Sequence, residues 1–196
     1  MRALGGEPTV LPIAKDTKDA IAAVADSVHG MDMLVTTGGA SVGDHDLVIE
    51  GLQTRGLVVN FWQIAMRPGK PLLFGALGPV PVLGLPGNPV SALVCAILFL
   101  LPAIARMSGL PAAPPPVTRA IAGAALKEND RRADHLRSTI STDAEGRIVA
   151  TPFPVQDSAM LRRLALADAL ILRAPHAPAL PAGAEIPIIR LDSLGL

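Results

Sequence analysis

The chain has 196 residues, of which 50% are hydrophobic, and its 17 basic residues balance 17 acidic residues. A chain of this size and apolar content can bury one sizeable core and a second, smaller one. Because the net charge is zero, there is no broad basic surface to recruit nucleic acid or an anionic membrane, and an anion site needs a local cluster of cations.

Strand and helix patterns alternate in the first part of the chain. Residues 1–4, followed by Gly5 and Gly6, resemble the last turn of a helix, so we expect a helix upstream of this chain. The next expected elements are a strand at 10–13, a helix from Asp16 or Thr17 to about His29, a strand at 33–37, a helix at 47–54 and strands at 57–64, 72–74 and 80–85. An apolar helix follows and ends near Met107. The alternation predicts a three-layer α/β/α domain with a mostly parallel sheet over residues 1–110.

A proline-rich segment at 111–116 predicts a stiff linker between two domains. Beyond this linker the helical period is lost, and turns separate short strand-like runs. These runs lie at 119–122, 136–141, 147–152, 169–172 and 186–191. We therefore expect a small, β-barrel-like C-terminal domain over residues 117–196.

The apolar run at 90–105 is shorter than the roughly 20 residues that a membrane span needs, and it contains Pro102. We interpret it as a core helix and expect no membrane partner. Cys95, the only cysteine, lies in this run, which excludes an internal disulfide and fits a reducing compartment. No leader pattern precedes the first polar residues, so we expect a cytoplasmic protein.

A glycine-rich loop follows the expected strand at 33–37, in the sequence TTGGASVGDHD. Its three glycines let backbone amides approach anionic oxygens closely. These glycines are Gly38, Gly39 and Gly43. Ser41 can donate a hydrogen bond to a phosphate, while Asp44 and Asp46 can hold a divalent cation. The alternative is an ordinary connection in which Asp44 or Asp46 caps the next helix.

Two further loops leave strand ends in the same domain. In MRPGKP, Arg67 and Lys70 place two cations on a proline-stiffened turn, which favours a tetrahedral oxyanion. The alternative is a solvated basic turn. In GLPGNPVS, backbone amides and Ser91 meet the positive end of a helix, or the loop simply caps that helix. Three such loops at one sheet edge predict a ligand site.

The second domain contributes fewer candidate site residues. At the expected strand that begins near Arg131, alternation places residues on two faces. One face carries Arg132, Asp134 and Leu136, and the other carries Arg131, His135 and Arg137. In the segment 156–160, Asp157 or Ser158 fits a helix cap. The four histidines, His29, His45, His135 and His176, have no metal-ligand spacing, so a zinc site is not expected.

The motifs TTGGASVGDHD, MRPGKP and GLPGNPVSA, in this order, resemble those of the molybdopterin molybdenumtransferases, the family that includes bacterial MoeA and the E domain of gephyrin. The resemblance spans nearly the whole chain. It implies that molybdate and adenylylated molybdopterin are substrates, that Mg²⁺ is a cofactor and that AMP is released. It also implies a small-molecule site and a homodimer in the full-length family member.

The resemblance assigns roles to individual residues. It places molybdate against Arg67, Lys70, Arg132 and Ser158, although the first of these positions is often lysine in the family. It places Mg²⁺ and phosphate at Ser41, Asp44 and Asp46. Contacts to the pterin phosphate fall near Pro71, Asn88 and Ser91, beside the glycines of the first loop. We expect Asp46, Lys70 and Arg67 to carry the catalysis by positioning and charge.

The chain also departs from the family pattern. Two preceding domains, and the strand and helix with a Gly-Asp-Glu-Leu type motif that open the central domain, are not in this sequence. We therefore expect little or no transferase activity from residues 1–196 alone, either because they are a fragment or because another chain supplies the rest. The alternatives are a molybdopterin adenylyltransferase-like enzyme, a non-catalytic scaffold or binding module, and a degenerate protein without activity.

Overall fold

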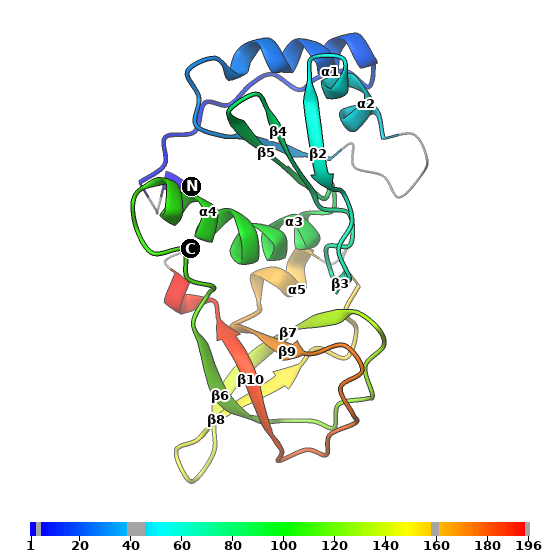
Figure 1. The fold of residues 1–196 in the computed structure, drawn as a ribbon. Helices are drawn as coiled ribbons and strands as arrows, with labels where there is room; N and C mark the ends of the chain where they lie inside the picture. The colour runs from blue at the N-terminus through cyan, green and yellow to red at the C-terminus, as the bar shows by residue number, and fades with distance from the viewer. Residues whose placement is uncertain (3–4, 39–45, 158–160, 195–196) are drawn as a thin grey trace. The chain divides into compact units, whose positions relative to one another are not determined.

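The structure is a computed structural model of the chain, and it describes residues 1–2, 5–38, 46–157 and 161–194 (Figure 1). It consists of two compact units. Unit 1 comprises Met1–Ile64 and Gly69–Ala112, and unit 2 comprises Ala65–Pro68 and Ala113–Leu196. Residues 65–68, which lie inside the range 1–110 along the chain, therefore belong structurally to the second unit.

Two short helices of unit 1 begin at side-chain caps. Helix α1 (Lys18–Val24) begins after Thr17, whose hydroxyl accepts a hydrogen bond from the Ala20 N–H. It continues as a 3-10 turn over Ala25–Val28. Helix α2 (Leu47–Gln53) begins after Asp46. Polar caps of this kind satisfy the first N–H groups of a helix, which is why both helices were predictable from sequence.

The sheet of unit 1 has four strands in the order β1-β5-β4-β2. They are β1 (Leu34–Thr37), β2 (Leu57–Phe61), β4 (Leu73–Leu77) and β5 (Val80–Leu85). The α/β class is confirmed, but the sheet is mixed instead of mostly parallel: β1 pairs with β5 in parallel, whereas β4 pairs antiparallel with both β5 and β2. The two-residue connection at Gly78, with its positive φ of 56°, joins β4 to β5 as a hairpin, which forces antiparallel pairing.

The predicted strand at 10–13 was wrong. This segment has no regular secondary structure, and the side chains of Val10 and Ile13 are 88% and 99% exposed. A strand forms only where a neighbouring strand offers backbone partners. In the described part of the chain, β1 pairs with β5 alone, and residues 10–13 do not pair with its open edge or with any other strand.

The helices cover both faces of this sheet (Figure 1). Helices α1 and α2 pack on one face, with Ile21 and Leu52 in a core shared with Leu73 and Val82. On the other face a continuous helix runs through α3 (Pro89–Cys95), a π turn (Ala96–Leu100) and α4 (Leu101–Met107).

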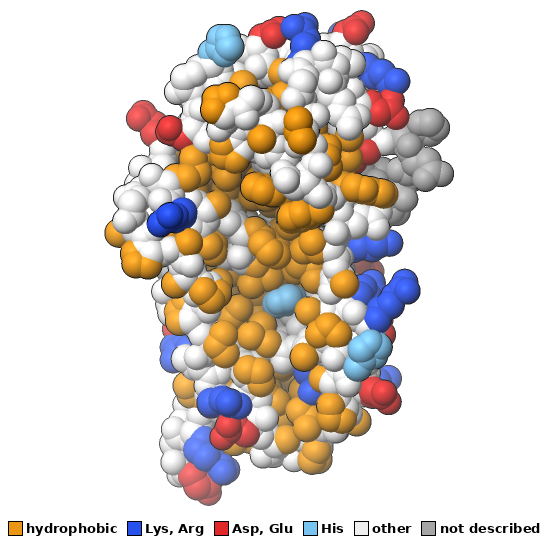
Figure 2. All heavy atoms as spheres, in the orientation of Figure 1, with side chains coloured by type: hydrophobic (Ala, Val, Ile, Leu, Met, Phe, Trp, Pro, Cys, Tyr) orange, Lys and Arg blue, Asp and Glu red, His pale blue; other side chains and the backbone are white. Residues whose placement is uncertain are grey.

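This long helix, Pro89–Met107, is the one described helix long and apolar enough to cross a membrane by length and composition, with a mean hydropathy of 2.2. One side of it is buried, at Val90, Val94, Ile97 and Ile104. Leu93 on the same helix stays exposed, and Figure 2 shows hydrophobic side chains on the surface over this region.

Unit 2 is a closed β-barrel, as predicted. Its strands are β6 (Val117–Ala122), β7 (Ala133–Thr142), β8 (Ile148–Pro152), β9 (Ala169–Arg173) and β10 (Glu185–Arg190). The sheet order β7-β8-β6-β10-β9 closes on itself through an antiparallel pairing of β7 with β9. Small and branched side chains fill the interior, among them Ala150, Ile171 and Ile186. The short helix α5 (Leu161–Ala165) precedes β9, and a 3-10 turn, Asp192–Leu194, follows β10.

A two-residue strand, β3 (Met66–Arg67), joins the barrel from a distant part of the sequence. It pairs in parallel with the start of β7, with Met66 opposite Ala133 and Arg67 opposite Asp134. Met66 is buried. This pairing is the reason that residues 65–68 belong to unit 2, and it carries Arg67 to the barrel.

Candidate functional site

Arg67 is held by a buried carboxylate on the neighbouring strand. Its Nε donates to Oδ1 of Asp134 at 2.8 Å, and its Nη2 donates to the other oxygen of the same carboxylate. The Asp134 side chain is only 6% exposed, whereas the Arg67 side chain is 45% exposed. The hydrogen bond to Asp134 raises the pKa of Arg67. Asp134 therefore fixes the plane of a guanidinium group whose other donors lie at 3.5 Å from the side-chain oxygens of Asp130 and Asn129.

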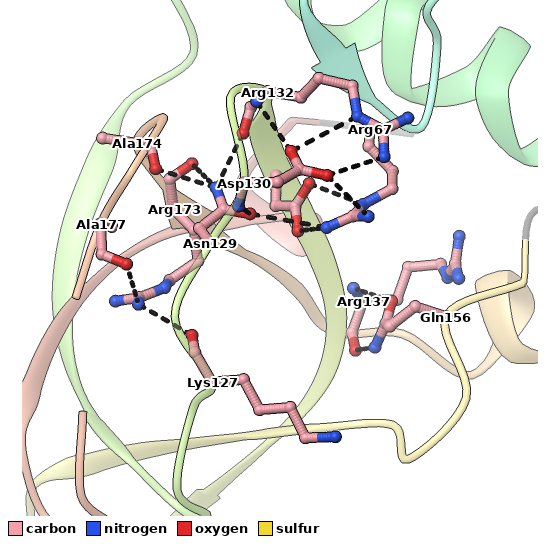
Figure 3. A network of polar contacts seen from close by, with 11 residues as sticks. Arg67, Lys127, Asn129, Asp130, Arg132, Arg137, Gln156, Arg173, Ala174 and Ala177 are labelled. Carbon is pink, nitrogen blue, oxygen red and sulfur yellow. Dashed lines mark hydrogen bonds and ion pairs between the residues drawn. The ribbon is translucent and has the colours of Figure 1, made fainter. Parts of the chain in front are cut away.

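A second carboxylate brings Arg67 and Arg132 together (Figure 3). The Nη2 of Arg132 donates to Oδ2 of Asp130 at 2.9 Å, and the Nη1 of Arg67 lies 3.5 Å from the same oxygen. The backbone N–H of Arg132 donates to the other oxygen, Oδ1, at 2.8 Å. The hydrogen bond from the Arg132 side chain, with smaller help from Arg67, lowers the pKa of Asp130 to about 2. Two of the predicted oxyanion-binding residues thus share one carboxylate.

Two buried polar side chains hold the turn that carries Asp130 and Arg132. The Asn129 amide donates to the carbonyl of Arg132 at 2.7 Å and to that of Ala174 at 2.8 Å. Arg173 donates through Nη2 to several carbonyls of the adjoining loops. These belong to Lys127, Ala177 and Pro178. Because the turn is tied to the barrel at these points, its two charged side chains occupy defined positions.

Sequence reasoning missed Asn129 and Asp130. The available signal was the Asn-Asp pair directly before two arginines, since both residue types form turns by hydrogen bonding to nearby backbone groups. The sequence pattern placed Asp134 on one face of an expected strand and gave it no role in the site. That it lies opposite Arg67 depends on the pairing of β3 with β7, which no local pattern reveals.

Gln156 fastens the segment before the predicted Ser158 to the barrel. Its Oε1 accepts a hydrogen bond from the Arg137 N–H at 2.9 Å, and its Nε2 donates to the Arg137 carbonyl at 2.9 Å. The Arg137 side chain is buried, and its Nη2 donates to the carbonyl of Asp157 at 3.2 Å. Ser158 itself lies outside the described residues.

In unit 1, two glycine loops meet at the carboxyl ends of parallel strands β1 and β5. The Gly38 N–H donates to the Leu85 carbonyl, and the Thr37 hydroxyl donates to the Pro86 carbonyl, each at 3.3 Å. A Cβ atom on Gly87 would lie 3.1 Å from the Cα of Gly38, so the close approach needs a glycine there. Gly38 also has a φ of 83°, which favours glycine.

Two residues predicted to bind ligand or metal are helix caps in the structure. Oδ1 of Asn88 accepts a hydrogen bond from the Val90 N–H at 3.1 Å. Oδ1 of Asp46 accepts from the N–H groups of Val48 and Ile49, at 3.0 and 3.2 Å. Burial raises the pKa of Asp46, more than these hydrogen bonds lower it. The cap alternative stated from sequence therefore describes at least part of what both residues do.

The other predicted residues of unit 1 have simpler surroundings. Ser91 is buried in the first turn of α3, Lys70 is exposed and Pro71 is partly buried. The Lys70 carbonyl accepts a hydrogen bond from the Ile64 N–H at 3.0 Å. The remaining loop residues, Gly39, Ser41, Gly43 and Asp44, lie outside the described residues.

Comparison with protein families gives two matches that together span most of the chain. Residues 1–106 match the family described as a probable molybdopterin binding domain. Residues 119–191 match the C-terminal region, domain IV, of MoeA. The second match favours the molybdenumtransferase interpretation over the adenylyltransferase alternative, which does not usually carry such a β domain.

Individual relatives agree with these matches. The chain is 42% identical over 118 residues to molybdopterin molybdenumtransferase of Haemophilus influenzae, covering 60% of this chain and 29% of the relative. It is 37% identical over 110 residues to the protein of that name from a Nostoc species, covering 54% of this chain and 25% of the relative.

Among solved structures, the molybdopterin biosynthesis MoeA protein from Pyrococcus horikoshii matches with a TM-score of 0.77 and 26% identity, over 95% of this chain and 44% of that chain. The chain therefore spans less than a third of each of these two curated relatives and under half of the solved one. With both domains matched in order, the chain belongs to the molybdopterin molybdenumtransferase family.

Proposed function

We propose that this chain provides the molybdopterin-binding and oxyanion-binding parts of an enzyme that inserts molybdate into adenylylated molybdopterin. In the overall reaction the phosphoanhydride bond is cleaved and AMP leaves, while the two dithiolene sulfurs replace two oxygen ligands of molybdate; one of these oxygens completes the cleaved phosphate and the other leaves as water. Because the chain spans less than a third of the curated relatives described above, the complete reaction is proposed for an assembly that includes their remaining part.

The arrangement of Arg67 and Arg132 around Asp130 is the observation that carries the proposal. Guanidinium groups present several N–H donors in a plane and match the oxygens of tetrahedral oxyanions. Here Asp134 orients one guanidinium and the turn at Asn129 positions the other. A molybdate dianion at this place would accept hydrogen bonds from both, and Lys70 and Ser158 are the further contacts that we propose.

The glycine loops of unit 1 support the pterin-phosphate part of the proposal. Ligands of open α/β sheets bind outside the carboxyl ends of parallel strands, where Gly38 and Gly87 meet. The helix that begins at Asn88 adds the partial positive charge of its first N–H groups. We propose that Gly38, Asn88 and Ser91 bind the phosphate together with Pro71 and the loop at 39–43.

Mg²⁺ belongs to the proposal as the ion that, when bound, offsets charge on the phosphoanhydride. This ion requires near-octahedral oxygen coordination, with several waters retained. Asp46 already uses Oδ1 to cap α2, and the part of the chain that the structure describes contains no group of three or more His, Cys, Asp or Glu side chains suited to a metal. The described residues thus supply one candidate ligand, Asp46, beside Asp44 and Ser41 outside them, and no step is assigned to the ion.

We also propose a homodimer, as in the full-length family member, and a cytoplasmic location. The support for the location is chemical: Cys95 is fully buried, and a single buried thiol is suited to a reducing compartment.

The proposed activity is tested by reconstitution. The chain is combined with the remaining region of the Haemophilus influenzae relative, adenylylated molybdopterin, Mg²⁺ and molybdate, and AMP is measured. We expect molybdate-dependent AMP release from the mixture, little from the chain alone, and a loss of about tenfold or more in Arg132→Ala. Asp143→Asn, in the exposed Asp143–Arg147 pair, is the matched control. AMP release that ignores molybdate or the Arg132 substitution contradicts the proposal.

A further inference from the structure

The two carboxylates beside Arg67 differ sharply in their surroundings. The Asp134 side chain is 6% exposed and engages Arg67 through both oxygens, whereas the Asp130 side chain is 46% exposed. One carboxylate is therefore part of the barrel, and the other stands at its surface. This difference suggests that they act differently when an anion binds.

Breaking the ion pair between Asp134 and Arg67 would cost much free energy. Asp134 lies opposite Arg67 in the register of β3 and β7, which pair in parallel at this point. A buried carboxylate that loses its cation is left desolvated and uncompensated, which is strongly unfavourable. Asp134 is thus a fixed partner that sets the orientation of Arg67.

Asp130 is bound differently. Its carboxylate reaches Arg132 at 2.9 Å and Arg67 at 3.5 Å, in contact with solvent on one side. Exposed ion pairs of this kind contribute little free energy and exchange readily with other ions. The carboxylate nevertheless lies between the two guanidinium groups, where it occupies the donors that an external oxyanion needs.

We propose that Asp130 is a displaceable counter-ion that fills the oxyanion position between Arg67 and Arg132 until the ligand arrives, while Asp134 is a positioning residue for Arg67. This inference rests on the proposed function. A ligand must outcompete a carboxylate tethered beside the same donors, which acts at high effective concentration. A doubly charged oxyanion does so because it gains more attraction from the two cations than a single carboxylate supplies.

The test uses substitutions of the two acids, with molybdate alone as the probe. In Asp130→Asn the side-chain oxygen still accepts the Arg132 N–H bond that shapes the turn, but the competing charge is gone. Titration calorimetry should show molybdate binding that is up to about fivefold tighter than in the wild type. Asp134→Asn should instead bind molybdate about tenfold more weakly.

A double-substitution cycle separates positioning from a general effect on folding. If Asp134 acts through Arg67, Asp134→Asn should have no further effect on molybdate affinity in the Arg67→Ala background. Asp143→Asn, which removes an exposed carboxylate paired with Arg147 in the same unit, should leave affinity unchanged. Melting temperatures of all variants are measured in parallel, so that a loss caused by unfolding is recognised.

The outcomes separate the counter-ion role of Asp130 from the proposed function. If the wild type binds molybdate and Asp130→Asn binds it equally or more weakly, the counter-ion inference is overturned and the proposed function stands. If the effect of Asp134→Asn persists fully without Arg67, the positioning role is overturned. If neither the wild type nor Asp130→Asn binds molybdate, the proposed function fails, and this inference fails with it.

Discussion

The guanidinium group of Arg67 pairs with the carboxylate of Asp134, a residue 67 positions further along the chain, with Nε 2.8 Å from Oδ1. This pair holds Arg67 against the barrel. Arg67 therefore belongs to unit 2, although the residues before and after 65–68 in the sequence belong to unit 1. Arg67 and Arg132 are consequently held by one compact unit. Their spacing is set within the barrel by Asp130, Asp134 and Asn129.

The stability of this pair can be measured directly. Arg67→Met leaves the buried Asp134 carboxylate without its partner, so we expect the free energy of unfolding to fall by about 2 kcal/mol, less than for a fully buried pair because Arg67 is half-exposed. Urea unfolding measures the loss. Adding Asp134→Asn should restore part of it, and Arg119→Met, in the exposed Arg119–Glu185 pair, is the control with little effect. An equal loss of stability in Arg67→Met and Arg119→Met would contradict this expectation.

Two substitutions of Asp46 separate its role as a helix cap from the role of its charge. Asp46→Ala removes the acceptor for the Val48 and Ile49 N–H groups and should cost about 1 kcal/mol of stability. Asp46→Asn keeps the cap and should leave stability nearly unchanged. If Asp46 also binds Mg²⁺, Asp46→Asn weakens the Mg²⁺ dependence of the reconstituted enzyme. Unchanged activation by Mg²⁺ in this variant would leave Asp46 as a cap only.

The lowered pKa of His135 should make the stability of the chain depend on pH. Burial is the main cause that lowers its pKa below the ordinary value of 6.5, against weaker opposing effects of the Arg67 backbone and the Asp134 carboxylate. The unfolded chain then binds a proton more tightly than the folded one, so this residue's contribution is complete above pH 6.5 and is lost as the pH falls through the lower folded value. Urea unfolding at pH 7.5 and 5.5 measures the change. His135→Gln should reduce this difference, and a difference as large as in the wild type would refute the assignment.

Cys95 should be chemically inert in the folded protein. Its side chain is fully buried against the Gly69 carbonyl, with Sγ 3.8 Å from that oxygen, and burial raises its thiol pKa to about 12. Since the thiolate is the reactive form, a thiol reagent at pH 8 should modify the native chain far more slowly than the urea-unfolded chain. Equal rates in the two states would show that Cys95 is not buried in the folded protein.

Local signals accounted for the elements that sequence predicted well. Thr17 and Asp46 cap α1 and α2 within the first turn of each helix, and the strands of the barrel follow short apolar runs between turns. The strand expected at 10–13 failed for a different reason. Val10 and Ile13 have suitable side chains, but strand formation also needs a partner elsewhere in the fold.

The candidate site was only partly predictable for the same physical reason. The motifs identified Arg67 and Arg132 individually, and the resemblance assigned them to one anion. Their common carboxylate, Asp130, and the buried partner Asp134 depend on the pairing of β3 with β7 across more than sixty positions. Such long-range pairing leaves no periodic trace in the sequence near Arg67.

A crystal of this chain soaked in tungstate tests directly whether Arg67 and Arg132 bind the oxyanion, because tungstate shares the charge and shape of molybdate and has strong anomalous scattering. We expect an anomalous peak within hydrogen-bonding distance of the Arg67 and Arg132 guanidinium groups, with the Asp130 carboxylate moved away from them. A peak bound elsewhere, with Asp130 still between the two arginines, would contradict this expectation.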